Sequence, residues 1–422
     1  MLTTRLGLAA VGVAALSLVA TSSGSGARAA DGVTIDGMTE VAVEPVEVDA
    51  DGSPSFATSV WSISDDGRLV LYFSAAENAG DSLPLFGHGK LWVWDRATDS
   101  RTPVATDAEG EPVQGLGCCG GGELSGDGRF VVFGHKSRRL VSSGHNPNRY
   151  VFVKNLKTGL IERTRLTGPA EYTGWRLPEL YVGAVSGNGR YVAGSADFET
   201  DEFRRRPMAC YLLDRKTDEL RWISPLDRER LIQCNTVRAL SDDGRYAVWQ
   251  VEKRFGVYDR VAGSSTRLPP HPDGEAWLPS GFIYSDDGRL VVTDWFNRNT
   301  YEESVLLQRR ATGTVVEEVT ALGSVSAISA DGRYLIGEAN PEDFRWWQAY
   351  RYDRRTDKLL LVSRNARGRP ANFYSGCCLM SADGQVVGFT TPASNLVPGD
   401  EPLGADSDDH DWDGFLATTG PN

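Results

Sequence analysis

A five-residue turn motif recurs seven times along the 422 residues of this chain and constrains its fold more than any other feature. The motif reads Ser, any residue, Asp or Asn, Gly, Arg, and a run rich in Val, Leu, Tyr and Phe follows it. The copies begin at Ser64, Ser125, Ser186, Ser241, Ser285, Ser329 and Ser381, and the last carries Gln385 in place of Arg. Glycine readily takes the positive φ that tight hairpin turns need. Intervals of 61, 61, 55, 44, 44 and 52 residues favour propeller blades with loops of varying length.

A second unit of strand and turn follows most copies of the motif. It is a short apolar run ending in Asp-Arg-x-Thr or a close variant, as in Leu91–Thr98 and Tyr350–Thr356. Another β-rich run then follows, for example Val315–Val319, so each repeat predicts four antiparallel strands joined by three turns. Such a repeat is one blade of a β-propeller, in which radial repetition protects the strand edges. The predicted blades occupy residues 55–110, 113–168, 179–225, 233–270, 277–321, 323–364 and 371–418.

The two ends of the chain complete the predicted ring. Blade seven runs out after a third strand near Gly414–Ala417, and an unassigned β-rich segment, residues 38–48, precedes blade one. Placing this segment as the outer strand of blade seven closes the ring, whereas two separate β domains would leave both ends unpaired. The sequence therefore predicts an all-β fold, a seven-bladed β-propeller of four-stranded antiparallel blades closed by the N-terminal strand.

The repeat resembles the TolB-like, WD-repeat-like propeller family. The last blade, Ser381–Phe389 followed by Pro392–Asp400, is most similar to a version found in secreted actinobacterial propeller proteins. The resemblance extends over about residues 38–418, although no copy here has the Pro that usually follows the Ser. It implies the fold but leaves the function open, because propellers serve as enzymes, receptors and scaffolds alike.

Residues 1–29 are typical of a secretory signal peptide. Arg5 supplies the positive charge, Leu6–Ala20 an uncharged and mostly apolar run, and Ala27 and Ala29 the small residues that a signal peptidase recognises. The apolar run is shorter than the roughly 20 residues that a membrane-spanning helix needs. We expect cleavage after Ala29 and a single, secreted propeller domain over residues 30–422 that is not inserted in a membrane.

The charge of the chain limits its partners. A formal net charge of −13 argues against binding to nucleic acid or to anionic lipid, and it leaves room for cations. We expect a monomer whose partner is a protein, a peptide or a glycan.

The mature chain contains six cysteines, an even number that suits an oxidising compartment. They are Cys118, Cys119, Cys210, Cys234, Cys377 and Cys378. One interpretation pairs Cys210 with Cys234 and makes each adjacent pair a vicinal disulfide. Crosslinks between the two adjacent pairs across the channel, or free thiols, are the alternatives. A thiol metal site lacks the usual Cys-x-x-Cys spacing.

The C-terminal loop offers a candidate calcium site. Asp409, Asp411 and Asp413 alternate before Gly414, like the first half of a calcium-binding loop, and Asn395 and Asp400 could add oxygen ligands. The closing carboxylate of an EF-hand is absent, so the match is partial. A solvated acidic tail is the alternative. Calcium is the only cofactor that the sequence suggests.

The sequence lacks a convincing catalytic set. It has no Gly-x-Ser-x-Gly motif in the mature chain, and its histidines are His88, His135, His145, His271 and His410. A metal site formed by the first three is conceivable, but exposed loop histidines are the simpler interpretation. Trp175 and Trp277 precede predicted inner strands, where they could stack on sugars at a channel mouth; packing within the fold is the alternative.

These features lead to two functional hypotheses. The first is a secreted, non-enzymatic binding or scaffold propeller that holds a protein, a peptide or a cell-wall glycan at a channel mouth. The alternative is an extracellular metal-dependent polysaccharide lyase, or a lactonase-like hydrolase, with its site in the channel. Histidines and carboxylates converging on one point of the channel would favour the enzyme.

Overall fold

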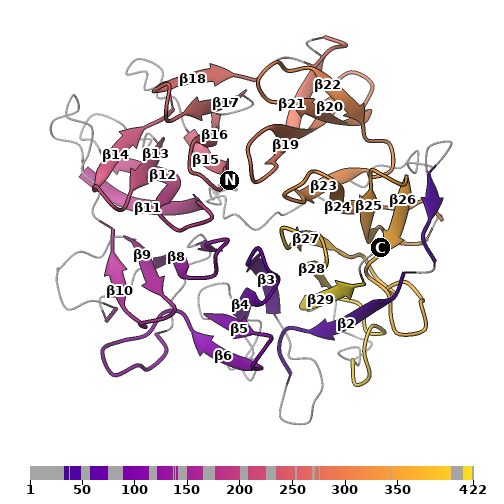
Figure 1. Cartoon of the computed structure of the whole chain (residues 1–422), viewed down its shortest axis with the longest axis horizontal. Coiled ribbons are helices and arrows are strands. Elements are labelled where there is room, and N and C mark those ends of the chain that lie inside the picture. Colours follow the sequence, from indigo (N-terminus) through magenta and orange to yellow (C-terminus); the bar gives the residue numbers. More distant parts are fainter. Residues whose placement is uncertain are drawn as a thin grey trace, which may run out of the picture.

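The computed structural model confirms the predicted fold, with seven β-sheets arranged radially around a central channel (Figure 1). The structure describes residues 33–48, 58–74, 89–113, 121–140, 150–164, 176–199, 208–224, 234–251, 254–268, 271–400 and 412–420, apart from residues 38, 136, 138, 275 and 343. Among these residues, no helix is long and apolar enough to cross a membrane.

Every blade contains four antiparallel strands, the first of which lines the channel (Figure 1). Blades one and two contain β3 (Thr58–Ile63), β4 (Leu69–Ser74), β5 (Lys90–Asp95) and β6 (Ser100–Pro103), then β7 (Gly122–Leu124), β8 (Phe130–His135), β9 (Tyr150–Asn155) and β10 (Ile161–Arg163). Blades three and four contain β11 (Arg176–Val185), β12 (Tyr191–Glu199), β13 (Met208–Asp214) and β14 (Glu219–Trp222), then β15 (Cys234–Leu240), β16 (Tyr246–Val251), β17 (Arg254–Asp259) and β18 (Ser264–Arg267). Blades five and six contain β19 (Trp277–Tyr284), β20 (Leu290–Asn297), β21 (Glu303–Arg309) and β22 (Val315–Glu318), then β23 (Ser324–Ile328), β24 (Tyr334–Ala339), β25 (Gln348–Asp353) and β26 (Lys358–Leu361). Blade seven contains β27 (Gly376–Met380), β28 (Val386–Thr391), β29 (Asp413–Thr419) and β2 (Val41–Pro45).

The repeated motif forms the turn between the first and second strands of each blade. In blade one, the Ser64 hydroxyl donates to Oδ1 of Asp66 (2.6 Å) and accepts the N–H of Leu69 (2.9 Å). Asp66 Oδ1 also accepts the N–H of Arg68 (2.9 Å), and Gly67 takes a φ of 68°. These local side-chain to backbone bonds explain why Ser, Asp and Gly recur at fixed positions.

The hydrophobic core lies between neighbouring blades. Between blades five and six, for example, Val292 and Leu307 pack with Leu335 and Tyr350 in one buried cluster. The second and third strands of a blade are covered on both faces, so they have nearly continuous apolar sequences such as Tyr246–Val251.

Arginine side chains connect successive blades at the turns. Arg215 of blade three donates to the carbonyl of Gly189 in its own turn (2.6 Å), and its guanidinium lies 4.6 Å from the ring centroid of Phe130 in blade two. Arg260 repeats this arrangement one blade further on, over Tyr191 at 4.3 Å. Each cation–π contact of this kind contributes on the order of 1 kcal/mol.

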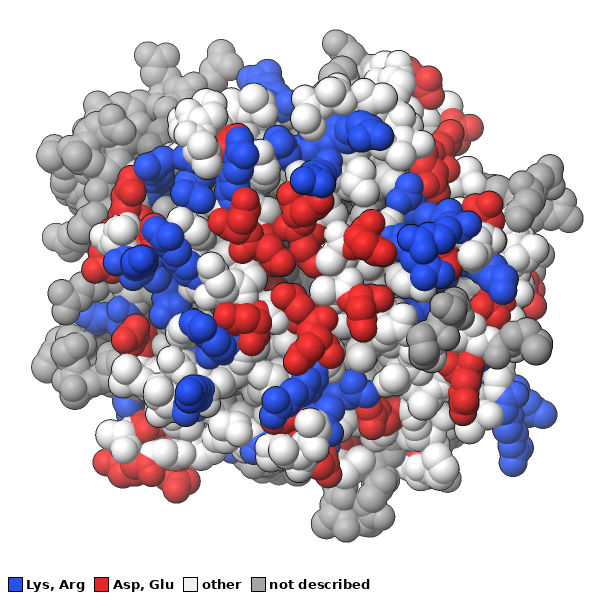
Figure 2. Space-filling model, viewed as in Figure 1, with Lys and Arg blue, Asp and Glu red and all other residues white. Residues whose placement is uncertain are grey.

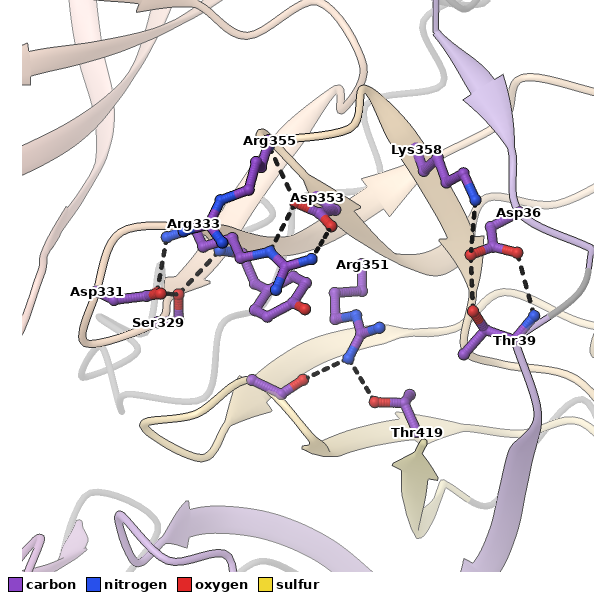
Figure 3. A network of polar contacts seen from close by, with 12 residues as sticks. Asp36, Thr39, Ser329, Asp331, Arg333, Arg351, Asp353, Arg355, Lys358 and Thr419 are labelled. Atoms are coloured by element: carbon purple, nitrogen blue, oxygen red, sulfur yellow. Dashed lines mark hydrogen bonds and ion pairs between the residues drawn. The ribbon is translucent and has the colours of Figure 1, made fainter. Parts of the chain in front are cut away.

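The N-terminal segment closes the ring in two places. As predicted, β2 pairs antiparallel with β29 and forms the outer strand of blade seven (Figure 1). Unexpectedly, β1 (Thr34–Ile35) pairs parallel with β26 and adds a fifth strand to blade six. Asp36 follows β1 and accepts hydrogen bonds from the backbone and hydroxyl of Thr39 (Figure 3). A two-residue strand carries too little periodicity to be detected in the sequence.

Candidate functional site

Three aspartates from separate blades meet at one end of the channel. Asp65, Asp242 and Asp286 each occupy the second position of the turn motif, in blades one, four and five. One carboxylate oxygen from each lies within 4.8 Å of the other two. We call the end of the channel that bears these turns the turn mouth, and the three residues the aspartate triad.

Backbone hydrogen bonds between blades hold the second turn positions around the turn mouth. The N–H of Asp65 donates to the carbonyl of Gly126 in blade two (2.9 Å), and the N–H of Asp242 donates to the carbonyl of Asp286 in blade five (3.0 Å). The N–H of Ala382 in blade seven donates in turn to the carbonyl of Asp65 (3.0 Å). These backbone hydrogen bonds therefore fix the position of the main chain at each triad residue, and they do not involve the carboxylates.

Small residues at the same turn position leave space for the triad. The second positions of blades two, three, six and seven are Gly126, Gly187, Ala330 and Ala382. A Cβ atom at Gly187 would lie 2.7 Å from Oδ1 of Asp242, and one at Gly126 would overlap the Asp65 carboxylate. The two glycines thus leave the space that these carboxylates occupy.

No described side chain forms a hydrogen bond or ion pair with a triad carboxylate. Four arginines of the turn motif pair with aspartates at the ends of third strands, whereas Arg129 and Arg289 pair with Asp127 and Asp287 of their own turns. Arg245 binds Asp259 through two contacts (3.1 and 3.0 Å), and Arg190 binds Asp214 in the same way (2.9 and 2.6 Å). Figure 2 shows the resulting pattern, in which acidic side chains surround the centre of this face and basic ones lie further out. Within the described part of the chain, no side chain therefore compensates the triad charges.

Burial and like charge raise the pKa of the triad carboxyl groups. Burial is the largest cause for Asp242, and the charges of Asp65 and Asp243 add to it, bringing its pKa to about 6. For Asp286, burial followed by the charges of Asp242 and Asp65 raises the pKa to about 7. The pKa of Asp65, the most exposed of the three, is raised by burial first and then by the charges of Asp127 and Asp66. Like charges this close disfavour full ionisation, whereas a bound cation favours it.

The tryptophans predicted from the sequence lie elsewhere. Trp175 is outside the described residues. Trp277 begins β19 at the opposite end of the channel, which we call the start mouth because the inner strands begin there. Its half-buried ring stacks on His271 with the centroids 4.3 Å apart, so one face of the indole is already covered. Sugar stacking on Trp277 stays a prediction.

The predicted calcium loop is only partly described. Asp409 and Asp411 lie outside the described residues, and Asp413 is buried at the start of β29. Asn395 Oδ1 accepts the N–H of Asn372 (2.9 Å), and Asp400 Oδ2 accepts the N–H of Leu396 (3.2 Å). Both side chains therefore stabilise loop backbone, and calcium binding at this loop stays a prediction.

The cysteine pairings are likewise predictions. Cys118 and Cys119 lie outside the described residues, as do the side chains of Cys234 and Cys377. Cys210 is fully buried in β13 and is disulfide-bonded. The backbones of β13 and β15 lie against each other, which is compatible with a bond between Cys210 and Cys234. Cys378 is buried in β27.

The two described histidines take part in loop structure. His135 Nδ1 accepts the N–H of Ser137 (2.8 Å), and His271 Nδ1 accepts the N–H of Asp273 (3.1 Å). They belong to different parts of the ring, and His88, His145 and His410 lie outside the described residues. Among the described residues, the aspartate triad is the only group with three converging metal ligands.

The sequence contained a signal for the triad. Acidic residues fill the variable second position of the motif in three copies, and Gly or Ala fills it in the other four. This division into charged and small residues could have identified the site. The seven turns of a propeller surround one channel, so the three aspartates are expected at the same end of it.

Comparison with known proteins finds similarity in fold only. No protein-family model matches it, and no curated protein does. An oligogalacturonate lyase in complex with manganese is similar at 13% identity and a TM-score of 0.55, over 90% of this chain and 96% of that one. An oligogalacturonate lyase from Vibrio parahaemolyticus shows 11% identity and a TM-score of 0.54, over 90% and 98%.

TolB from Acinetobacter baumannii also matches, at 12% identity and a TM-score of 0.38, over 73% of this chain and 64% of that one. A likeness this weak carries no argument about function. What the comparisons show is the fold, that of a seven-bladed β-propeller.

Proposed function

We propose that this chain is a secreted, non-enzymatic binding propeller that holds a divalent cation, calcium in the first instance, at its turn mouth. A protein, a peptide or a cell-wall glycan would bind there. The observation that carries the proposal is the convergence of three carboxylate oxygens, from three blades, within 4.8 Å of one another.

The donor set of the triad suits a hard cation. Carboxylate oxygens are preferred ligands of calcium and magnesium, and calcium takes six to eight oxygens. Three aspartates provide up to three formal negative charges, and water or a ligand would complete the coordination sphere. Because Asp65 is exposed and the other two are half-buried, an ion here would stay accessible to a partner.

Thermal unfolding with and without calcium tests this proposal. We expect the melting temperature of the wild-type protein to rise with calcium concentration, because an ion that binds only the folded state stabilises it. Asp242→Asn should abolish most of the rise, whereas Glu109→Gln, which removes one charge from an exposed connecting turn, should keep it. Asp411→Asn separates the triad from the C-terminal loop. A calcium response lost in Asp411→Asn but kept in Asp242→Asn would refute the triad as the site.

The triad also supports the enzymatic alternative. A calcium ion with open coordination positions can act as a Lewis acid, so a metal-dependent hydrolase of the lactonase kind remains the second candidate. Calcium-dependent release of acid from a panel of lactones, lost in Asp242→Asn, would favour it over a binding module.

A further inference from the structure

The fifth motif position carries an arginine that is tightly paired in four blades. In blade one, Arg68 Nε and Nη2 donate to the two carboxylate oxygens of Asp95, which ends the third strand (2.9 and 2.6 Å). The same pairs join Arg190 with Asp214, Arg245 with Asp259, and Arg333 with Asp353. In these blades the guanidinium is therefore neutralised by the protein itself.

Blades two and five lack the aspartate that ends the third strand. At the same position of the ladder they have Asn155 and Arg309. Oδ1 of Asn155 accepts the N–H of Lys157 (3.0 Å), so the amide keeps a turn contact but carries no charge. Arg309 brings a like charge. The fifth-position arginines of these two blades, Arg129 and Arg289, therefore lack the partner that the other four have.

Arg129 and Arg289 are open to solvent. Their side chains are 65% and 85% exposed, and each has one ion-pair contact, at 3.4 and 3.5 Å, with Asp127 and Asp287 of its own turn. Exposed ion pairs of this kind contribute little to stability. Arginine forms two parallel hydrogen bonds with a carboxylate, so each guanidinium gains by exchanging its single contact for a carboxylate of a ligand.

Each open arginine adjoins a residue of the aspartate triad. The carbonyl of Gly126, in the turn of Arg129, accepts the N–H of Asp65 (2.9 Å). Arg289 follows Asp286 in the same turn. Figure 2 shows basic side chains around the acidic centre of this face. A ligand with several negative charges could therefore contact an ion in the triad and the arginines around it.

A second cation lies beside each open arginine. The carbonyl of Arg129 accepts the N–H of the residue before Lys157 (2.9 Å), and the carbonyl of Arg289 accepts the N–H of the residue after Arg309 (2.9 Å). Lys157 and Arg309 are exposed. Among the described residues, none forms a hydrogen bond or ion pair with the side chain of Arg309. Blades two and five thus each present two exposed positive charges at the turn mouth.

The aromatic rings that follow the motif are covered, which favours a peptide over a sugar. Phe130 has the guanidinium groups of Arg129 and Arg215 at 5.2 and 4.6 Å from its centroid. Tyr191, Tyr246 and Tyr334 are buried, and each also has two guanidinium groups against its ring. These rings offer no open face on which a pyranose could stack, whereas the carboxylates of a peptide need only the cations.

We propose that Arg129 and Arg289, together with Lys157 and Arg309, bind the carboxylates of a peptide rich in Asp or Glu that lies across the turn mouth. This inference rests on the proposed function and names the class of partner for the same mouth. A calcium ion in the triad adds positive charge at the centre, so it should strengthen peptide binding. The net charge of −13 opposes non-specific attraction of an anion, so binding depends on these local cations.

Titration calorimetry at low ionic strength tests this site with two blocked peptides, hexaglutamate and the uncharged hexaglutamine. We expect the full-length protein in calcium to bind hexaglutamate at least about tenfold more tightly than hexaglutamine. The double variant Arg129→Gln/Arg289→Gln should weaken hexaglutamate binding by about tenfold. Arg298→Gln removes a positive charge from an exposed hairpin at the start mouth and should bind like the wild type.

Supplying the missing partner tests the same site without removing an arginine. Asn155→Asp gives Arg129 the carboxylate that Arg68 has in blade one, so hexaglutamate binding should weaken several-fold. Asn188→Asp is the matched control, because it adds the same charge to an exposed turn of blade three, where Arg190 is already paired. An equal loss in both variants would overturn the role of the open arginine.

Thermal unfolding separates this inference from the proposed function. A calcium-dependent rise in melting temperature, with equal affinity for the two peptides or wild-type affinity in the double variant, would overturn the peptide site and leave the ion site standing. The converse result is hexaglutamate binding that the double variant loses, without any calcium response. It would support the arginines and refute the ion site. Tighter binding of an alginate hexasaccharide than of hexaglutamate, lost in the double variant, would assign the arginines to an acidic glycan instead.

Discussion

Arg351 of blade six donates a hydrogen bond to Thr419, the last residue of β29 in blade seven (Figure 3). Thr419 occupies the place that arginine takes in other blades: its N–H donates to Gln385, as the N–H of Arg215 donates to Arg190. In blade seven, the guanidinium of Arg351 from the neighbouring blade takes the place of the missing arginine side chain. It donates to the carbonyl of Gly384 (2.7 Å) and lies 4.4 Å from the ring centroid of Tyr334.

Replacing Arg351 should therefore weaken the closure of the ring. Its side chain is 1% exposed, so Arg351→Met removes a buried charge but leaves the Gly384 carbonyl without this partner. We expect the free energy of unfolding to fall by about 2–4 kcal/mol. Urea denaturation measures the change, and Arg355→Met, at an exposed position of the next turn, is the matched control. A loss no larger than in that control would mean that Arg351 does not support closure.

The space at Gly126 allows a test of the triad that leaves its charge intact. Gly126→Ala would place a methyl group where the Asp65 carboxylate lies, and the carboxylate would have to leave its present position in the triad. We expect the calcium-induced rise in melting temperature to fall several-fold, while stability without calcium changes by less than about 1 kcal/mol. Gly37→Ala is the control, because a Cβ atom there has no neighbour within 4 Å. An unchanged calcium response in Gly126→Ala would argue against the triad geometry.

The raised pKa values of the triad predict how stability depends on pH. An unfolded aspartate has a pKa of about 3.9, whereas Asp286 and Asp242 have values of about 7 and about 6 in the folded protein. Between these limits the folded state binds more protons than the unfolded state, so stability falls as the pH rises. We expect wild-type protein in EDTA to lose about 1–2 kcal/mol more than Asp286→Asn between pH 5 and pH 8, allowing for partial solvation.

Urea midpoints at the two pH values measure this difference, and Asp286→Asn serves as the reference. Burial also raises the pKa of Glu123, to about 8, and of Asp294, to about 7. These groups are present in both proteins, so their contributions cancel in the comparison. Calcium should remove most of the pH dependence of the wild-type protein, because the ion favours the ionised carboxylates. Parallel curves for the two proteins in EDTA would contradict the assignment.

The fold could be predicted because each turn is a local structure that repeats. The hydrogen bonds of Ser64 and Asp66 and the positive φ of Gly67 all lie within five residues. Their pattern is therefore visible in any single copy of the motif. The triad could not be predicted in the same way. Asp65 and Asp286 are far apart in the chain and meet only because the turns surround one channel. The parallel strand β1 was missed because two residues carry too little periodicity to be detected, whereas the longer β2 was predicted although its partner, β29, is even more distant in sequence.

The disulfides provide a last prediction that needs no mutation. Cys210 is buried and bonded, and we expect Cys234 to be its partner, since β15 lies against β13. We expect Cys118 with Cys119, and Cys377 with Cys378, to form vicinal pairs. Under these pairings, alkylation of the unfolded protein without reductant should add no mass, whereas alkylation after reduction should modify all six cysteines. Non-reducing peptide mapping then identifies each pair. Modification of four cysteines without reductant would leave one disulfide, and modification of all six would leave none, so either result would contradict the presence of two vicinal pairs.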